Sequence, residues 1–192
     1  MRRPDTAAAL QAIARTEFLR YGFDGTDVSR IARRAGVSPN TFYRCFKGKV
    51  DIFIAVYLAW AAEEQKAFER LLGKPAPVAE LVDAVVARQR QHLWFRRSVR
   101  RLAHEDSFVR RAVALVRHEQ LRALMRWASA AADPSAIATD LAQFEHLAVL
   151  LAEGELSDMA LDESAARDRL VAFLMRWRLR PAPALEGPAI SA

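Results

Sequence analysis

Apolar residues recur at the three- and four-residue spacing of α-helices over most of this chain of 192 residues. In the first segment Leu10, Ile13 and Phe18 fall on one helical face. This helix is expected to begin at residue 5 or 6, where an aspartate and a threonine can cap it, and to stop at Gly22. Glycine suits that position because it readily adopts the left-handed conformation that follows many helices.

Two shorter segments with helical spacing follow. One starts after Thr26 or Asp27 and ends at Gly36, where the absence of a side chain permits the positive φ of a tight turn. The next starts at Ser38, a capping residue followed by proline at the first helical position, and runs to about Phe46. Two short helices joined by a tight turn predict a helix-turn-helix.

Longer helical patterns occupy the remainder. One covers residues 49–72 and is ended by a Gly-Lys-Pro-Ala-Pro sequence. Helical spacing then extends over residues 78–132, with a break expected around residues 104–107. Asp133 is placed to cap a further helix, and a loop at residues 154–163 precedes the last one.

No stretch alternates like a β-strand, so the chain is predicted to be all-α. An N-terminal three-helix helix-turn-helix domain is expected at residues 1–50, and a larger helical ligand-binding and dimerisation domain at 51–180. Residues 181–192, with three prolines and one charge, are predicted to be a disordered tail. The longest uncharged apolar run, residues 52–62, is too short to cross a bilayer, and the single cysteine, Cys45, gives no disulfide framework. These features favour a cytoplasmic protein with no membrane partner.

The net charge of +6 lies entirely in the first 50 residues, which hold ten lysines and arginines and four acids. The rest of the chain carries equal numbers of basic and acidic residues. A basic segment joined to a neutral domain is typical of a nucleic-acid-binding module, although a solvated basic face without a partner has the same composition.

The third helix separates apolar from polar side chains. At about 100° per residue, Phe42, Cys45 and Phe46 share one side and are expected to face the core. The opposite side can meet DNA, where Asn40 suits an adenine edge and Arg44 suits a guanine or a phosphate. The outward set is Asn40, Thr41, Tyr43, Arg44 and Lys47.

In residues 18–49 an aromatic residue, Phe18, lies four positions before Gly22, and Thr26 follows. The pairs and groups Ile-Ala, Ala-Gly-Val-Ser and Phe-Tyr, then a phenylalanine and a lysine, complete the pattern. This series resembles the DNA-binding domain of the TetR family, the tetracycline-repressor-like regulators, over about residues 8–58. Two positions depart from the family pattern. Cys45 replaces a common aromatic residue or histidine, and Val50 replaces a frequent acid that Asp51 supplies one position later.

The resemblance implies that Thr26, Tyr43 and Lys49 contact DNA phosphates, and that residues 39–41 and Arg44 lie along the groove. It further implies a homodimer on double-stranded operator DNA with an inverted repeat, usually a repressor that a small-molecule effector releases. The expected DNA-binding residues are Thr26, Ser38, Pro39, Asn40, Thr41, Tyr43, Arg44, Lys47 and Lys49.

Aromatic residues lie on the helices that enclose a ligand cavity in this family. Such linings are normal for small-molecule sites, but aromatic residues at helical spacing also occur in ordinary cores. The expected ligand-binding residues are Tyr57, Trp60, Trp94, Phe95 and Trp127. A concentration of arginines between residues 96 and 126 allows an anionic ligand, such as a carboxylate or an acyl-coenzyme A, but charge patterning favours a solvated helix face.

The last two helices carry apolar stripes that would serve a two-fold helix bundle between subunits. The same stripes would serve equally well to close the core of a single subunit, because periodicity does not distinguish the two kinds of burial. The expected dimer interface is Leu141, Phe144, Leu147, Leu151, Leu170, Phe173, Leu174 and Trp177.

No catalytic constellation, cofactor motif or metal-binding spacing is found among the histidines, the cysteine or the glycines. The chain is therefore predicted to be a sequence-specific transcriptional regulator, a repressor controlled by a small hydrophobic ligand, and not an enzyme. A regulator of the same fold controlled by a protein partner is the alternative. A helical enzyme is the alternative of another class, and no motif supports it.

Overall fold

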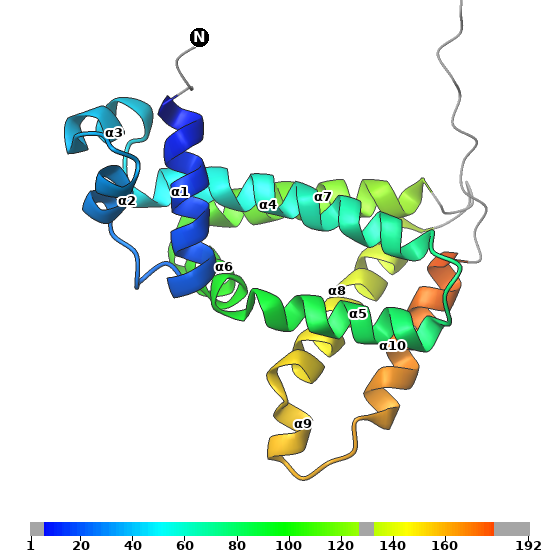
Figure 1. Cartoon of the computed structure of the whole chain (residues 1–192). Coiled ribbons are helices and arrows are strands. Elements are labelled where there is room, and N and C mark those ends of the chain that lie inside the picture. Colours follow the sequence, from blue (N-terminus) through cyan, green and yellow to red (C-terminus); the bar gives the residue numbers. More distant parts are fainter. Residues whose placement is uncertain (1–5, 127–132, 179–192) are drawn as a thin grey trace, which may run out of the picture. The chain divides into compact units, whose positions relative to one another are not determined.

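The computed structural model describes residues 6–126 and 133–178, and it contains helices and no strands over these residues (Figure 1). The all-α prediction is therefore confirmed. The helices are α1 (Thr6–Tyr21), α2 (Val28–Arg34), α3 (Pro39–Cys45), α4 (Lys49–Leu72), α5 (Val78–Gln91), α6 (Leu93–Glu105), α7 (Ser107–Met125), α8 (Pro134–Glu153), α9 (Glu155–Asp158) and α10 (Ser164–Arg178). Within this described part, no helix is long and apolar enough to span a membrane.

The chain divides into two compact units. The first unit comprises residues 6–68 and 88–117, and the second comprises residues 69–87, 118–126 and 133–178. The first unit reaches well beyond the helix-turn-helix because α4 and α6 share its core. The tail predicted at residues 181–192 lies outside the described residues.

The helix ends follow the local signals in the sequence. Asp27 is the cap of α2, where its carboxylate accepts a hydrogen bond from the N–H of Arg30 at 2.7 Å. Ser38 caps α3 by accepting from the N–H of Thr41 at 3.2 Å. The turn between these helices passes through Gly36 at φ 70°, a conformation that favours glycine.

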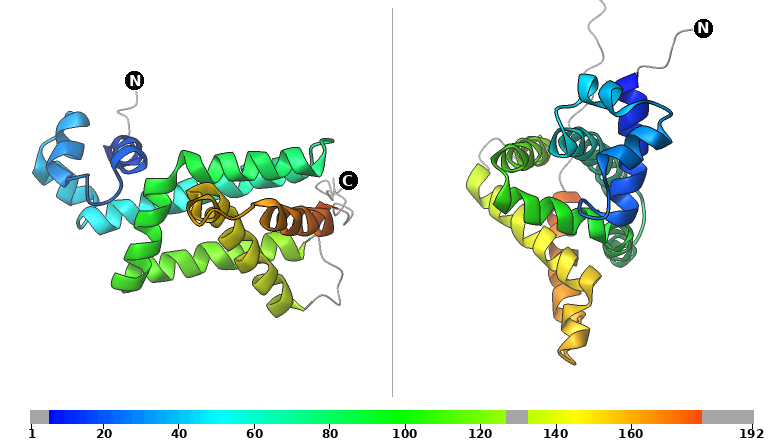
Figure 2. Two further views of the ribbon diagram at one scale, coloured as in Figure 1. Left: turned by 90° about the horizontal axis from the view of Figure 1, so that it is seen from below. Right: turned by 90° about the vertical axis from the view of Figure 1, so that its left-hand side faces the viewer.

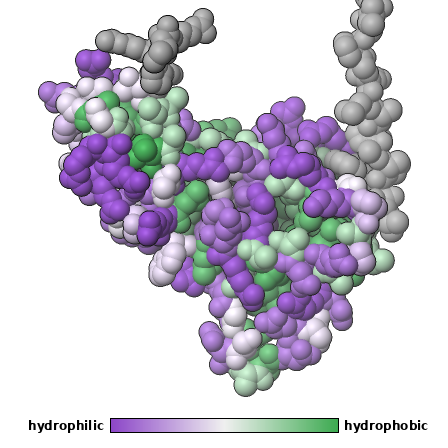
Figure 3. All heavy atoms as spheres, in the orientation of Figure 1, coloured by the Kyte–Doolittle hydropathy of each residue, from purple (hydrophilic) through white to green (hydrophobic). Residues whose placement is uncertain are grey.

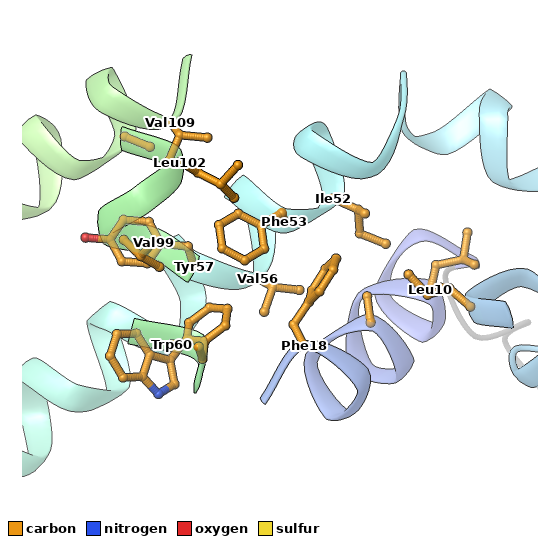
Figure 4. Close-up of a cluster of buried hydrophobic side chains, with 14 of the residues drawn as sticks. Leu10, Phe18, Ile52, Phe53, Val56, Tyr57, Trp60, Val99, Leu102 and Val109 are labelled. Atoms are coloured by element: carbon orange, nitrogen blue, oxygen red, sulfur yellow. The ribbon is translucent and has the colours of Figure 1, made fainter. Parts of the chain in front are cut away.

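The core of the first unit combines aliphatic side chains with aromatic rings that contact one another across helices (Figure 4). Phe53 of α4 is fully buried and lies edge-on to Phe18 of α1, with ring centroids 5.1 Å apart. On another side Phe53 meets Phe95 of α6 at 5.3 Å. Full burial of each ring contributes about 2–3 kcal/mol to stability. These rings therefore stabilise the packing of α1, α4 and α6 against one another.

The second unit is held by the pairing of α8 with α10 (Figure 2). Phe144 of α8 packs edge-on against Trp177 of α10, with ring centroids 4.9 Å apart, and Phe173 stacks on Trp177 at 5.9 Å. An ion pair between Arg176 and Asp140 joins the same two helices. These contacts make the pair a compact layer with its own apolar core.

Two details differ from the sequence prediction. The pattern over residues 78–132 breaks at Asp106, as expected, but it also breaks at His92, which no glycine or proline announces. Asp106 stops α6 and caps the next helix by accepting hydrogen bonds from the N–H groups of Phe108 and Val109. The expected loop at residues 154–163 contains the single turn α9.

Candidate nucleic-acid interface

The helix α3 is anchored by its inner face. Phe42 is fully buried, and Cys45 and Phe46 are partly buried against the same core. This arrangement confirms the predicted division of α3 into an inner and an outer side. Because Phe42 fixes the rotation of the helix about its axis, the outer side chains point away from the core.

The outer face of α3 presents polar groups to solvent. Asn40, Arg44 and Lys47 are exposed, and among the described residues their side chains form no hydrogen bond or ion pair. Tyr43 is 57% exposed. In Figure 3 hydrophilic atoms cover much of the surface around α2, beside this helix. An amide, a guanidinium and an ammonium group are therefore available to an external partner.

The remaining predicted contacts of α3 lie at its start. Ser38 and Pro39 are exposed, whereas Thr41 is half-buried. The hydroxyl groups of Ser38 and Thr41 lie 3.0 Å apart, and the Ser38 hydroxyl also caps the helix. These residues stabilise the start of α3 more than they offer free hydrogen-bonding groups.

Two residues expected to contact phosphate lie in more enclosed surroundings. Thr26 is only 1% exposed, and its hydroxyl donates to the carbonyl of Gly22 at 2.9 Å, which stabilises the end of α1. The ammonium of Lys49 lies 4.1 Å from the ring centroid of Phe23. Partial burial lowers the pKa of Lys49, and the nearby carboxylate of Asp24 opposes that shift. Phosphate contact by Thr26 and Lys49 stays a prediction.

A buried carboxylate links α1 to α2. Glu17 is fully buried; Arg30 Nε lies 2.7 Å from its Oε2, and Arg34 pairs with its other oxygen. Sequence reasoning missed this cluster. The signal was present, because Glu17 lies seven residues after Leu10 and one before Phe18, on the apolar face of α1.

This cluster reduces the positive charge that is available to DNA. Arg30 and Arg34 are engaged by Glu17, and Arg15 pairs with Glu63. Among the described residues of the basic segment, the exposed cations without an ion pair are Arg20, Arg33, Arg44 and Lys47. The net charge of the segment therefore overstates its free basic surface.

The helix α6 is attached to the end of α1 and to the loop before α2. The hydroxyl of Ser98 accepts a hydrogen bond from the N–H of Phe23 at 3.0 Å and donates to the carbonyl of Trp94. Arg101 pairs with Asp24 at 2.7 Å. A shift of α6 would strain these contacts, which connect it to the helices that carry the polar face.

The residues expected to bind a ligand have different surroundings. Tyr57, Trp60 and Phe95 are buried in the core of the first unit, with Trp60 and Phe95 edge-on at 5.2 Å. Trp94 is 64% exposed. Burial raises the pKa of Tyr57 to about 12. Trp127 lies outside the described residues. A ligand role for this set stays a prediction.

The residues expected at a dimer interface are mostly enclosed within the single chain. Seven of the eight are buried there, and Leu147 is half-buried. The second interpretation of the stripes, that they close the core of one subunit, is sufficient to explain these seven. Exposed apolar groups on α10 lie elsewhere, and Met175 is 49% exposed.

No metal centre is formed in the part of the chain that the structure describes, because no three His, Cys, Asp or Glu side chains gather closely enough to hold an ion.

Comparison with known proteins identifies the helix-turn-helix. Residues 10–56 match the family model described as "Bacterial regulatory proteins, tetR family". No curated protein sequence matches the chain.

Solved structures of low sequence identity share the fold over nine-tenths or more of this chain. A TetR-family transcriptional regulator from Rhodococcus sp. is 17% identical with a TM-score of 0.62, and the match covers 90% of this chain and 98% of that one. One from Mesorhizobium loti is 18% identical with a TM-score of 0.60, covering 92% and 96%. The regulator RolR, solved in complex with resorcinol, is 16% identical with a TM-score of 0.54, covering 93% and 95%.

Proposed function

We propose that this chain, a DNA-binding transcriptional regulator of the TetR family, is a repressor that holds an operator as a homodimer and releases it when a small molecule binds. It would act in the cytoplasm, where the operator is. The observation that carries the proposal is the outer face of α3, where Asn40, Arg44 and Lys47 have no partner among the described residues. Helix-turn-helix proteins place such a helix in the major groove.

The side chains of this face divide by chemistry. The amide of Asn40 can pair with the N6 and N7 atoms of adenine, and the guanidinium of Arg44 with O6 and N7 of guanine. Tyr43 and Lys47 suit phosphates, which fix the register of the protein on DNA without reading its sequence. Lys49 would approach a phosphate from the start of α4, and Thr26 from the start of α2.

A two-fold dimer would present two copies of α3 to an inverted repeat. We place the contact between subunits on the outward side of α10. Val171, Ala172 and Met175 lie there at helical spacing, and Ala172 and Met175 are exposed. This stripe replaces the buried side of the same helix as the proposed interface.

Release requires a ligand that binds one arrangement of the protein better than the other. The contacts of α6 give a route for this effect, because Ser98 and Arg101 join that helix to the end of α1 and the loop before α2. A ligand that moves α6 would alter the placement of α3. The complex of RolR with resorcinol, whose fold is similar, supports control by a small molecule.

The experiment is selection of binding sites from random double-stranded DNA, followed by anisotropy with the selected site. The expected result is an inverted repeat whose half-sites lie about one helical turn, roughly 34–36 Å, apart. Selected sequences without a shared motif would contradict sequence-specific binding. If a broad panel of small aromatic and aliphatic molecules leaves the complex intact, control by a small hydrophobic ligand is wrong.

A further inference from the structure

A polar cluster inside the first unit has no part in the DNA-binding face. Trp60 of α4 is 5% exposed, and its indole Nε1 is enclosed without a hydrogen-bond acceptor. The guanidinium carbon of Arg96, on α6, lies 4.5 Å from the centroid of a Trp60 ring. Its Nε atom is also enclosed without an acceptor. Two N–H donors from neighbouring side chains are therefore left unsatisfied in the same place.

Such donors need an explanation because an unpaired buried N–H costs free energy. In Figure 4 the indole nitrogen of Trp60 and the hydroxyl of Tyr57 lie at the edge of the drawn cluster, away from Phe18 and Leu10. A ligand that offers oxygen acceptors would satisfy donors that the protein itself does not satisfy.

The charge of the surroundings favours an anion. Glu64 is the acid in contact with Arg96, at 2.8 Å, and it is shared with Arg88 at 2.7 Å. The carboxylate of Glu64 is therefore shared by two guanidinium groups.

Burial makes the positive charge of a guanidinium group costly at this place. It lowers the pKa of Arg96 to about 10 and also lowers the pKa of Arg117, whereas the carboxylate of Glu64 opposes the shift at Arg96. A second negative charge would offset the remaining cost. A neutral ligand would not.

We propose that this cluster binds an organic anion, a carboxylate on an apolar or aromatic body, whose oxygens accept from Nε of Arg96 and Nε1 of Trp60. The proposal rests on the proposed function, since it names the chemical class of the effector. Guanidinium groups match the geometry of carboxylates, and hydrogen bonds to a charged acceptor are the stronger kind. The rings of Tyr57 and Trp60, with centroids 6.3 Å apart, are the neighbouring apolar surface.

The test compares matched acids and amides on the full chain without DNA. The probes are 3-phenylpropanoate and octanoate, with 3-phenylpropanamide and octanamide as their neutral counterparts, measured by titration calorimetry. Each carboxylate is expected to bind at least about ten times more tightly than its amide, with a dissociation constant below about 1 mM.

Three variants identify the groups responsible. Trp60→Phe keeps a ring and removes the N–H, and it is expected to weaken carboxylate binding about tenfold. The amides should lose less, because their neutral carbonyl oxygen accepts a weaker hydrogen bond. Arg96→Gln is expected to abolish the preference for the acid. Arg97→Gln is the matched control, because Arg97 is the next residue of α6, is exposed and lies over Trp94. Circular dichroism checks that each variant is folded.

The outcomes separate this inference from the proposed function. Equal affinity for acid and amide, no binding by either carboxylate, or carboxylate binding that neither Trp60→Phe nor Arg96→Gln weakens would overturn the anion site. Carboxylates that bind through Trp60 but leave the operator complex intact would uphold the site and contradict the effector role. If only a neutral compound releases the operator, control by a small molecule is upheld, and an organic anion is not the effector.

Discussion

Replacing the buried carboxylate of Glu17 by an amide should destabilise the protein. The carboxylate is fully buried on α1 and pairs with Arg30 and Arg34 of α2. The variant Glu17→Gln keeps the shape of the side chain and removes its charge. Two guanidinium groups then lose their anion at the junction between α1 and the helix-turn-helix.

The magnitude follows from how far the two cations can return to water. Removing one partner of a fully buried ion pair costs about 3–5 kcal/mol. Here the side chains of Arg30 and Arg34 are 31% and 46% exposed, so part of their hydration is recovered when the anion is lost. We therefore expect a loss of about 2 kcal/mol, which lowers the melting temperature of a chain of this size by about 4–8 °C.

Thermal unfolding, followed by circular dichroism, measures this loss against a matched control. Glu63 pairs with Arg15 on the surface of the same unit, at 2.5 Å, with side chains 54% and 36% exposed. Glu63→Gln should cost no more than about 1 kcal/mol. If both variants melt at the same temperature, the buried ion pairs of Glu17 contribute no more to the free energy of unfolding than the exposed pair of Glu63.

Three further outcomes are expected. Lys49→Ala should lower the slope of log affinity against log salt by about one, as for one lost phosphate contact, and an unchanged slope would show that Lys49 does not touch the DNA backbone. Met175→Asp should give a folded protein that sediments as a monomer, whereas Phe173→Asp, at 7% exposure, should unfold the second unit; a dimeric Met175→Asp would exclude the proposed interface. In a titration of phenolate absorbance, the pKa of Tyr57 should be about 12, above its ordinary 10.0, and Tyr57→Phe should remove the highest step. Because its folded pKa is raised, Tyr57 contributes stability below pH 10 that is lost as the pH rises towards 12, and a highest step left in place by Tyr57→Phe would contradict the assignment.

Local signals in the sequence predicted the helix-turn-helix well because each acts over a few residues. Asp27 and Ser38 cap their helices through the next turn, and Gly36 has the positive φ that its place in the turn requires. The helical spacing of α3 is enough to place Phe42 on the inner face and Arg44 on the outer face. Such features depend little on the rest of the chain.

Features that depend on distant partners were harder to predict. Periodicity shows that Phe173 is buried, but not whether another helix of the same chain or a second copy covers it. The engagement of Arg30 by Glu17 joins two helices and is invisible to a count of charges. The break at His92 carries no glycine or proline, so only the packing around it reveals where α5 ends.

The most direct test of the central claim is the affinity of the protein and of Arg44→Ala for every single-base variant of its selected operator. If α3 reads the major groove, Arg44→Ala loses about 1–3 kcal/mol of discrimination at one base pair in each half-site, and preference elsewhere is kept. A uniform loss over all variants, or a profile identical to that of the unaltered protein, would contradict base reading by Arg44 on the outer face of α3.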